Sequence, residues 1–273
     1  KNIPISSGYH SAFQEFSRYF EFPFLVKPIT HYLKWFHNRT QITCVPSLDT
    51  AQSLEKMGVT GELKVVGRGV NIDVFNRQQR CELLRERWGV KVDTRVLISV
   101  GRLSPEKEVN VVIETFKKMQ DKGIENIKLV IVGDGPDRSN LEILAGQYDV
   151  IFMGSLTGVE LAQAYASADI FVFPSQVETF GNVALEALAS GLPIIAYDYA
   201  CAKLHVQHGK TGWLVPLGEI TAFTQIIEKI PDASMLREMG AKAERNVAEV
   251  GWMKPVNDFE SALYFAVEQT CSA

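Results

Sequence analysis

Two glutamates, with seven residues between them, flank the start of a predicted helix: Glu178 lies on the loop before it and Glu186 lies within it. The helix is expected to begin near Gly181, after an apolar strand and a loop, and to end at Gly191. Apolar side chains surround it, so its single ionisable group, Glu186, needs a strong hydrogen-bond donor to be buried without cost. Glu178 lies beside the backbone amides of residues 180–182, which suit an anion or a sugar hydroxyl. Two interpretations fit this spacing. Either both glutamates belong to a ligand site, or Glu186 forms a structural ion pair with a buried Lys or Arg while Glu178 is a solvated loop residue.

Two cations, Arg102 and Lys107, lie in a segment that directly follows a predicted strand and opens a helix. Arginine offers a diphosphate a bidentate fork, lysine offers a compact point charge, and the amides at a helix N-terminus favour the same anion. Each charge-assisted hydrogen bond contributes about 1.5–3 kcal/mol, enough for the pair to hold a departing nucleotide. The alternative is a solvated turn in which Glu106 favours the helix N-terminus.

Gly133 and Gly135 follow another apolar strand and partly match the dinucleotide fingerprint. The third glycine of that pattern is Arg138 here and Pro136 interrupts the loop. A nicotinamide-dependent oxidoreductase is therefore a weak alternative.

The elements that must position these residues alternate between strands and helices beyond Gln78. Apolar strands are predicted over 96–100, 128–132, 151–153, 170–173, 194–196 and 213–215, and amphipathic helices over 109–121, 138–147 and 161–167. Such alternation predicts a parallel sheet covered on both faces, which is one complete Rossmann-like domain.

The first part of the chain has fewer elements. Strands are predicted over 2–7, 41–46 and 63–66, with helices over 29–39 and from the N-cap Ser47 to Met57. Two helices, over 233–250 and 256–269, end the chain. Three strands are too few for a second complete domain, and since the first residue is Lys1 rather than Met, we expect the native beginning to be absent.

Composition limits the function further. The 273 residues are 46% hydrophobic with a net charge of -4, which argues against nucleic-acid binding. Four scattered cysteines favour a reduced, cytoplasmic setting, and no apolar run reaches membrane-spanning length. The histidines lack a third convergent ligand and no Asp-x-Asp motif occurs, so no metal site and no cofactor is expected.

Two motifs carry a family resemblance. Pro-Ser-x-x-Glu178-x-Phe-Gly-Asn-x-x-x-Glu186-Ala-x-Ala-x-Gly-x-Pro and Gly-Arg102-Leu-x-x-Glu-Lys107 closely resemble the signatures of glycosyltransferase family 4. These are retaining enzymes that use nucleoside diphosphate sugars, UDP- or GDP-linked. The resemblance implies the α/β GT-B fold, here a complete C-terminal Rossmann-like domain with a partial N-terminal one, lacking roughly its first hundred residues.

The resemblance also implies roles for individual residues. Glu186 binds the ribose, Arg102 and Lys107 hold the phosphates, Glu178 faces the donor sugar, and His10 approaches that sugar from the N-terminal domain. Further donor contacts are expected from Gly135, from the backbone of Phe152 and Met153 at the base, and from Phe180, Gly181, Asn182 and Val183.

Three departures from the family pattern stand out. Glu108 replaces the usual glycine after the lysine, Arg68 replaces a common asparagine, and residues 198–205 lack a glycine pair, so sugar preference can differ from that of relatives.

The domain plan implied is an acceptor-side domain over 1–76, a nucleotide-sugar donor domain over 77–254 and a helix over 255–273 that crosses back. The resemblance therefore implies a retaining, metal-independent hexosyltransferase with a saccharide or lipid-linked acceptor. A non-catalytic nucleotide-sugar-binding module is the alternative. The aromatic and basic residues of segment 13–39, with His37 among the basic ones, suit either a core, an acceptor cleft or peripheral contact with the inner face of a membrane.

Overall fold

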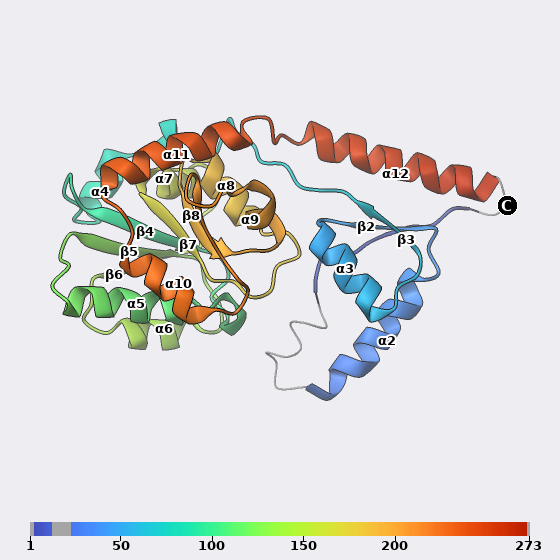
Figure 1. Ribbon diagram of the computed structural model, residues 1–273, viewed down its shortest axis with the longest axis horizontal. Helices are drawn as coiled ribbons and strands as arrows, with labels where there is room; N and C mark the ends of the chain where they lie inside the picture. Colours follow the sequence, from blue (N-terminus) through green and yellow to red (C-terminus); the bar gives the residue numbers. More distant parts are fainter. Residues whose placement is uncertain (1–2, 13–22, 272–273) are drawn as a thin grey trace. The chain divides into compact units, whose positions relative to one another are not determined.

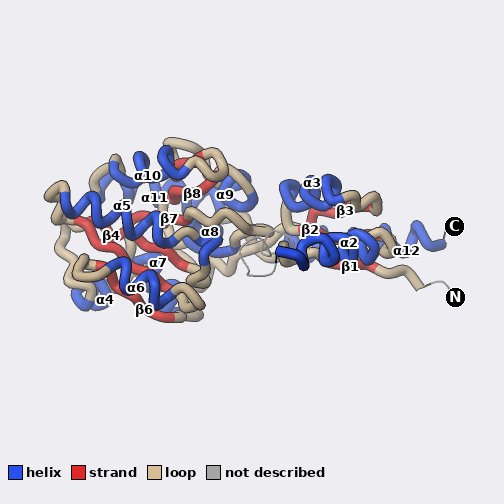
Figure 2. Tube along the Cα trace, turned by 90° about the horizontal axis from the view of Figure 1, so that it is seen from below, coloured by secondary structure: helices blue, strands red, loops and turns tan. Residues whose placement is uncertain are grey.

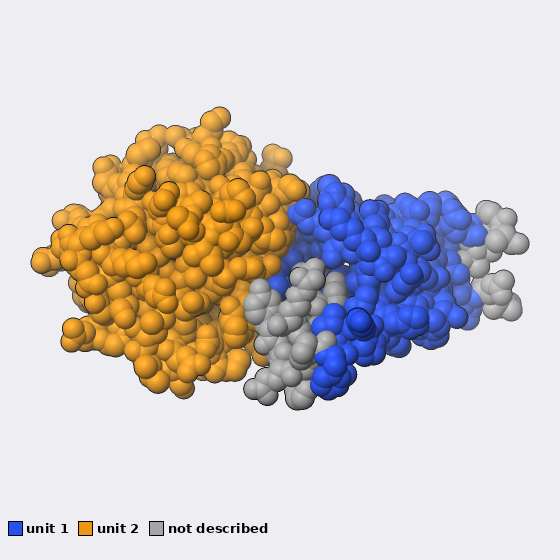
Figure 3. Space-filling view, turned by 60° about the horizontal axis from the view of Figure 1, so that its bottom comes forward, with its two compact units in different colours: residues 1–69, 177–181, 250–273 blue, residues 70–176, 182–249 orange. Residues whose placement is uncertain are grey.

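The computed structural model describes residues 3–12 and 23–271 and divides the chain into two compact units. Unit 1 comprises residues 1–69, 177–181 and 250–273, and unit 2 comprises residues 70–176 and 182–249 (Figure 3). The segment 177–181, which contains Glu178, thus groups with unit 1. The acceptor-side and donor-side roles expected for the two parts of the chain stay predictions.

Unit 2 is built on a six-stranded sheet in which all neighbouring strands are parallel. The strand order is β6-β5-β4-β7-β8-β9. Their bounds are β4 Arg95–Val100, β5 Ile127–Val132, β6 Val150–Gly154, β7 Ile170–Phe173, β8 Ile194–Tyr197 and β9 Gly212–Val215. All six predicted strands are confirmed, because near-continuous apolar runs are typical of strands buried on both faces.

Helices cover both faces of this sheet (Figure 1). One layer contains α5 Val109–Asp121, α6 Arg138–Ala145 and α10 Ile220–Glu228, and the other contains α4 Glu82–Arg87, α7 Gly158–Ser167, α8 Asn182–Ala189, α9 Ala200–His205 and α11 Ala233–Val247. The helices α4, α9 and α10 were not predicted. The predicted ends of α6 and α11 were too late; α6 stops at Ala145 because Gly146 takes a positive φ of 57°.

Unit 1 holds a parallel sheet in the order β1-β2-β3, with bounds Ser6–Gly8, Ile42–Val45 and Glu62–Val65. Its helices are α2 Val26–His37, α3 Leu48–Met57 and α12 Met253–Cys271 (Figure 2). Alternate residues of β2 face opposite sides: Ile42 and Cys44 pack with Ala262 and Ala266 of α12, whereas Val45 packs with the α3 layer. As predicted, Ser47 caps α3, accepting from the Thr50 amide at 3.2 Å.

Two boundaries in unit 1 differ from prediction. The first strand spans only Ser6–Gly8, because Pro4 has no amide hydrogen and the Ile5 amide donates to the Gln41 side chain at 2.7 Å. Helix α2 begins at Val26, before the predicted start, since a proline in the first helical turn costs no hydrogen bond. Short 3₁₀ turns occur at Pro23–Leu25 (η1), Arg77–Gln79 (η2) and Pro105–Lys107 (η3).

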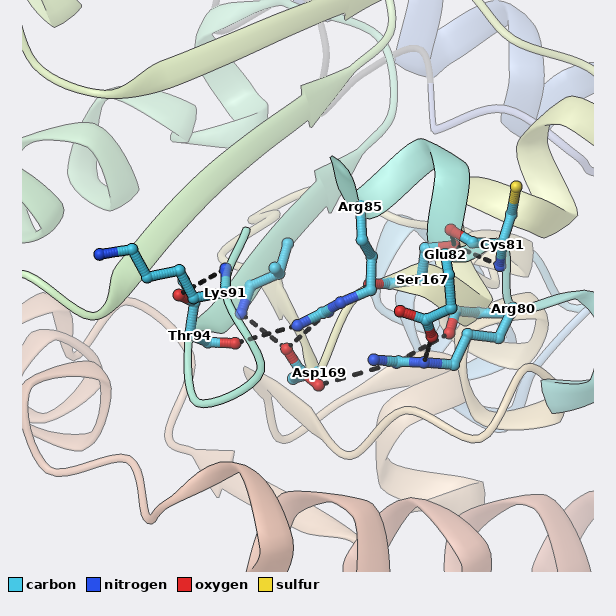
Figure 4. A network of polar contacts seen from close by, with 10 residues as sticks. Arg80, Cys81, Glu82, Arg85, Lys91, Thr94, Ser167 and Asp169 are labelled. Atoms are coloured by element: carbon cyan, nitrogen blue, oxygen red, sulfur yellow. Dashed lines mark hydrogen bonds and ion pairs between the residues drawn. The ribbon is translucent and has the colours of Figure 1, made fainter. Parts of the chain in front are cut away.

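A buried ion pair ties α4 to the amino-terminal ends of β4 and β7 (Figure 4). The Arg85 guanidinium donates to Asp169 Oδ2 at 3.1 Å and to the carbonyl oxygens of Ser167 and Thr94 at 2.7 and 3.1 Å. The same carboxylate oxygen accepts from the Val96 amide at 2.8 Å. These bonds hold the two central strands at the ends opposite the predicted ligand edge.

Candidate active site

The strand order of unit 2 reverses between β4 and β7, which are neighbours although two strands, β5 and β6, lie between them in the sequence. In open α/β sheets, ligands bind outside the carboxyl ends of the strands at such a switch point. The loop after β4 carries Arg102 and Lys107, and the loop after β7 carries Ser175 and Gln176. Topology alone therefore places the predicted phosphate-binding cations at the expected edge.

Lys107 joins these two loops. Its Nζ donates to Ser175 Oγ at 3.3 Å, and it lies at the end of η3. Arg102 is exposed, and its guanidinium makes no hydrogen bond or ion pair with any residue in the described part of the chain. An unpaired guanidinium at a ligand edge is available for a bidentate anion.

Glu106 contradicts the alternative of a solvated turn. Its side chain is buried and its Oε1 accepts from Ser104 Oγ at 2.5 Å, while its carbonyl accepts from the Gln176 amide at 2.9 Å. The segment 104–107 is therefore a fixed part of the sheet edge.

Glu108 was noticed in the sequence only as a departure from glycine, and the structure gives it a definite place. Its φ of 48° lies in the left-handed region that a glycine adopts freely. Its carboxylate accepts from Tyr197 Oη at 3.0 Å and from Gln176 Nε2. Burial raises the pKa of Glu108, and these two hydrogen bonds offset only part of that rise. The residue thus links the loop after β4 to the loop after β7 and to the last residue of β8.

Glu186 lies on α8, half-buried, and forms no ion pair with a residue in the described ranges. The structural ion pair considered for it is therefore wrong. Tyr165 Oη lies 3.3 Å from both Glu186 Oε2 and the Val183 carbonyl oxygen. Burial raises the pKa of Glu186, and the bond from Tyr165 lowers it only in part; burial and the neighbouring carboxylate also raise the pKa of Tyr165. A half-buried carboxylate without a cation is stabilised when hydroxyl groups of a ligand donate hydrogen bonds to it.

The glycines of the β5 loop have a packing role. A Cβ on Gly133 would lie 1.8 Å from the Gly101 carbonyl oxygen, and one on Gly135 would lie 2.2 Å from that of Leu103. Both glycines therefore let the β5 loop approach the β4 loop. At the end of β6, Phe152 and Met153 are half-buried, and Trp88 Nε1 lies 3.4 Å from Met153 Sδ. Their expected contacts with the donor stay predictions.

His10 and the segment 177–181 both belong to unit 1, and the structure brings them together. Thr179 Oγ1 donates to the His10 carbonyl at 3.1 Å, and the Thr179 carbonyl accepts from Ser47 Oγ at 3.0 Å. Arg68 Nη2 lies 3.0 Å from His10 Nδ1, a partner that the sequence did not reveal. Burial, and to a lesser degree the Arg68 charge, lowers the pKa of His10. Glu178, Phe180 and Gly181 belong to this segment, whereas Asn182 and Val183 open α8.

The segment proposed for membrane contact, 13–39, lies partly outside the described residues, which resume at 23. On α2, Tyr32 and Trp35 are exposed and their rings stack at 5.9 Å. His37 does not belong to this exposed surface: it is buried, with Nδ1 3.0 Å from Ser7 Oγ. Membrane contact stays a prediction. No helix within the described residues has the length and apolarity needed to cross a bilayer. The same part of the chain shows no cluster of three His, Cys, Asp or Glu residues suited to a metal ion.

Comparisons with known proteins show the family and the fold of this chain. The sequence model described as "Glycosyl transferases group 1" matches residues 82–247, more than half of the chain. The sulfoquinovosyl transferase SQD2 of Arabidopsis thaliana is 31% identical over 272 residues, which are 97% of this chain and 52% of that protein. A GDP-mannose-dependent alpha-mannosyltransferase of Mycobacterium tuberculosis is 34% identical over 232 residues, 85% of this chain and 57% of that protein. The chain thus spans about half the length of these curated relatives.

Among solved structures, the sucrose-phosphate synthase of Thermosynechococcus elongatus superposes with a TM-score of 0.81 at 22% identity, covering 100% of this chain and 69% of that one. This likeness confirms the predicted GT-B fold class. By its motifs, its fold and the family match across unit 2, the chain belongs to the group 1 family of glycosyl transferases.

Proposed function

We propose that this protein is a retaining glycosyltransferase that moves a hexosyl group from a UDP- or GDP-linked donor to a saccharide or lipid-linked acceptor. The observation that carries the proposal is the edge of unit 2 where Lys107 joins the loops after β4 and β7. The same β4 loop carries Arg102, whose guanidinium makes no hydrogen bond or ion pair with a described residue. A diphosphate leaving group needs such fixed cations. In the same unit, Glu186 is held by Tyr165 and takes the ribose hydroxyls.

The other roles rest on the family resemblance. Glu178 and the amides of 180–182 orient the sugar, and His10 contacts it. The bond between the anomeric carbon and the diphosphate breaks as a bond to the acceptor oxygen forms on the same face, and the acceptor proton passes to the departing phosphate. Arg102, Lys107 and the helix amides would then stabilise the negative charge on the departing diphosphate in place of a divalent ion.

Separate calorimetric titrations with UDP and GDP test the donor site. We expect one nucleotide to bind, and Arg102→Gln and Lys107→Gln each to weaken it at least tenfold, because each removes a charge-assisted bond of about 1.5–3 kcal/mol. Lys118→Gln, an exposed position on α5, is the matched control and should bind normally.

Acceptor-dependent release of nucleotide from a sugar donor tests turnover. Nucleotide binding without such release would favour a non-catalytic nucleotide-sugar-binding module. Failure of both UDP and GDP to bind would contradict the proposal. A covalent glycosyl adduct on Glu178, detected by mass spectrometry, would replace the same-face attack by a two-step route through that carboxylate.

A further inference from the structure

Unit 1 contains a cavity of about 450 Å³ that the sequence did not indicate. It lies where β1 and β3 end: Gly8 and His10 come from β1 and the loop after it, and Gly67 and Arg68 directly follow β3. The carboxyl ends of parallel strands are the usual ligand edge of an open sheet. The volume falls within the range of about 300–1,000 Å³ that is typical of small-molecule pockets.

One wall of the cavity is an apolar stripe that begins just before α12 and continues along it. Trp252, which directly precedes the helix, and Val256 and Phe259 on the helix line the cavity at a spacing of four and three residues, which is typical of one helical face. Further along that face, Ala262 and Ala266 are buried against β2. The stripe thus extends beyond the sheet that covers it, and its first three side chains are 49%, 53% and 45% exposed. A contiguous apolar surface of this kind is typical of a binding site.

The polar side of the cavity is positively charged. Among the described residues, Arg68 has one hydrogen-bond partner, the His10 ring at 3.0 Å, whose lowered pKa favours its neutral form. No carboxylate occurs among the described lining residues. Since Arg68 Nη2 donates to His10 Nδ1, the ring nitrogen Nε2 of a neutral His10 carries the hydrogen. Ser6 adds a hydroxyl group, whereas the Ser7 hydroxyl is hydrogen-bonded to Thr43, Thr40 and His37. The wall therefore offers several hydrogen-bond donors around one guanidinium and repels no anion.

We propose that this cavity binds an amphiphile that carries an anionic group, with its hydrocarbon part against Trp252, Val256 and Phe259 and its anion on Arg68. If the proposed function holds, this amphiphile is the acceptor of the reaction, and the acceptor class narrows to anionic lipid-linked molecules. That role rests on the proposed function. The binding itself does not depend on it.

The test titrates the protein with decyl phosphate below its micelle concentration, and with decanol as the neutral control of equal chain length. Tryptophan fluorescence and calorimetry report binding. We expect decyl phosphate to bind at least tenfold more tightly than decanol, and Arg68→Gln to remove that preference. Arg68→Lys, which keeps the charge, should retain most of it.

Two exposed positions on α12 give a matched pair. Val256→Glu places a carboxylate on the cavity wall and should abolish binding of decyl phosphate, whereas Val267→Glu lies outside the lining and should leave that binding unchanged.

Trp252→Phe should remove the fluorescence response and Trp35→Phe should not. Equal affinity for the two probes, unchanged affinity in Arg68→Gln, or a response that depends on Trp35 would overturn the proposal. Titration of the same samples with UDP and GDP tests the donor site independently, so loss of nucleotide binding alone would contradict the proposed function and not the cavity.

Discussion

Glu186 shows at the scale of one residue how a binding group can cost stability. Burial raises its pKa in the folded chain, so the folded state holds the proton more tightly than the unfolded chain does. The free energy of unfolding therefore falls as pH rises from the ordinary carboxyl pKa through the raised one, and the full cost of the ionised carboxylate is present above the raised pKa. A ligand that donates hydrogen bonds to the carboxylate offsets this cost.

Glu186→Gln tests this balance. The amide oxygen still accepts from Tyr165, so at pH 7 we expect a melting temperature equal to or above that of the unchanged protein, with the difference vanishing near pH 4. Nucleotide affinity should fall about tenfold or more, because a charge-assisted bond becomes a neutral one.

Thermal melts across pH and calorimetric titrations measure both effects. Glu114→Gln, exposed on α5, is the control for each. Unchanged nucleotide affinity in Glu186→Gln would show that the carboxylate does not bind the donor.

At the scale of elements, the Arg85–Asp169 pair fixes α4 and the two central strands of unit 2. The Asp169 side chain is fully buried, and the exposed fraction of the Arg85 side chain is 4%. Arg85→Met leaves that carboxylate with only the more distant Arg80, whose Nη1 lies 3.9 Å from Asp169 Oδ1, so we expect the free energy of unfolding to fall by about 3 kcal/mol, the low end of the range for a broken buried pair. Urea unfolding followed by circular dichroism measures the change. Arg87→Met, on the exposed side of α4, should change it little; equal effects of the two variants would contradict the role of the pair.

The same pair explains why part of the fold escaped prediction. The six strands of unit 2 were predictable because each is an apolar run that tertiary contacts reinforce. Helix α4 spans only Glu82–Arg87 and buries an arginine, so its sequence has no apolar face to detect. Helix α9 is equally short and is preceded by no side-chain cap. Such elements are held by partners far along the chain, about which local pattern says nothing.

The candidate site divides in the same way. Motif residues such as Arg102 and Lys107 could be placed because topology brings the loops after β4 and β7 to one edge. The contact of Arg68 with His10 could not, since 58 residues separate them and both lie in irregular segments. The cavity beside them exists because the sheet covers only part of the apolar stripe that runs along α12. The helical period of the sequence shows the stripe but does not show which part of it is covered.

At the scale of the whole molecule, the chain passes between its units at residues 69–70, 176–177, 181–182 and 249–250. Within unit 1, the segment that leaves and the segment that returns meet at two glycines. A Cβ added to Gly69 would lie 2.6 Å from the carbonyl carbon of Gly251 and 2.7 Å from the Trp252 nitrogen. These neighbours are backbone atoms and cannot rotate away, so the return of α12 to its place on β2 requires glycine at position 69.

We therefore expect Gly69→Ala to loosen α12 by about 1–3 kcal/mol, the usual cost of overpacking, and to leave nucleotide binding by unit 2 intact. Hydrogen exchange of the α12 amides measures the first effect and titration with UDP or GDP the second. Gly67→Ala is the matched control, because a Cβ there meets nothing within 4 Å. Faster exchange throughout both units in Gly69→Ala would mean that the two units unfold as one, and unchanged exchange in α12 would mean that the backbone at Gly251 yields to the added methyl group without cost.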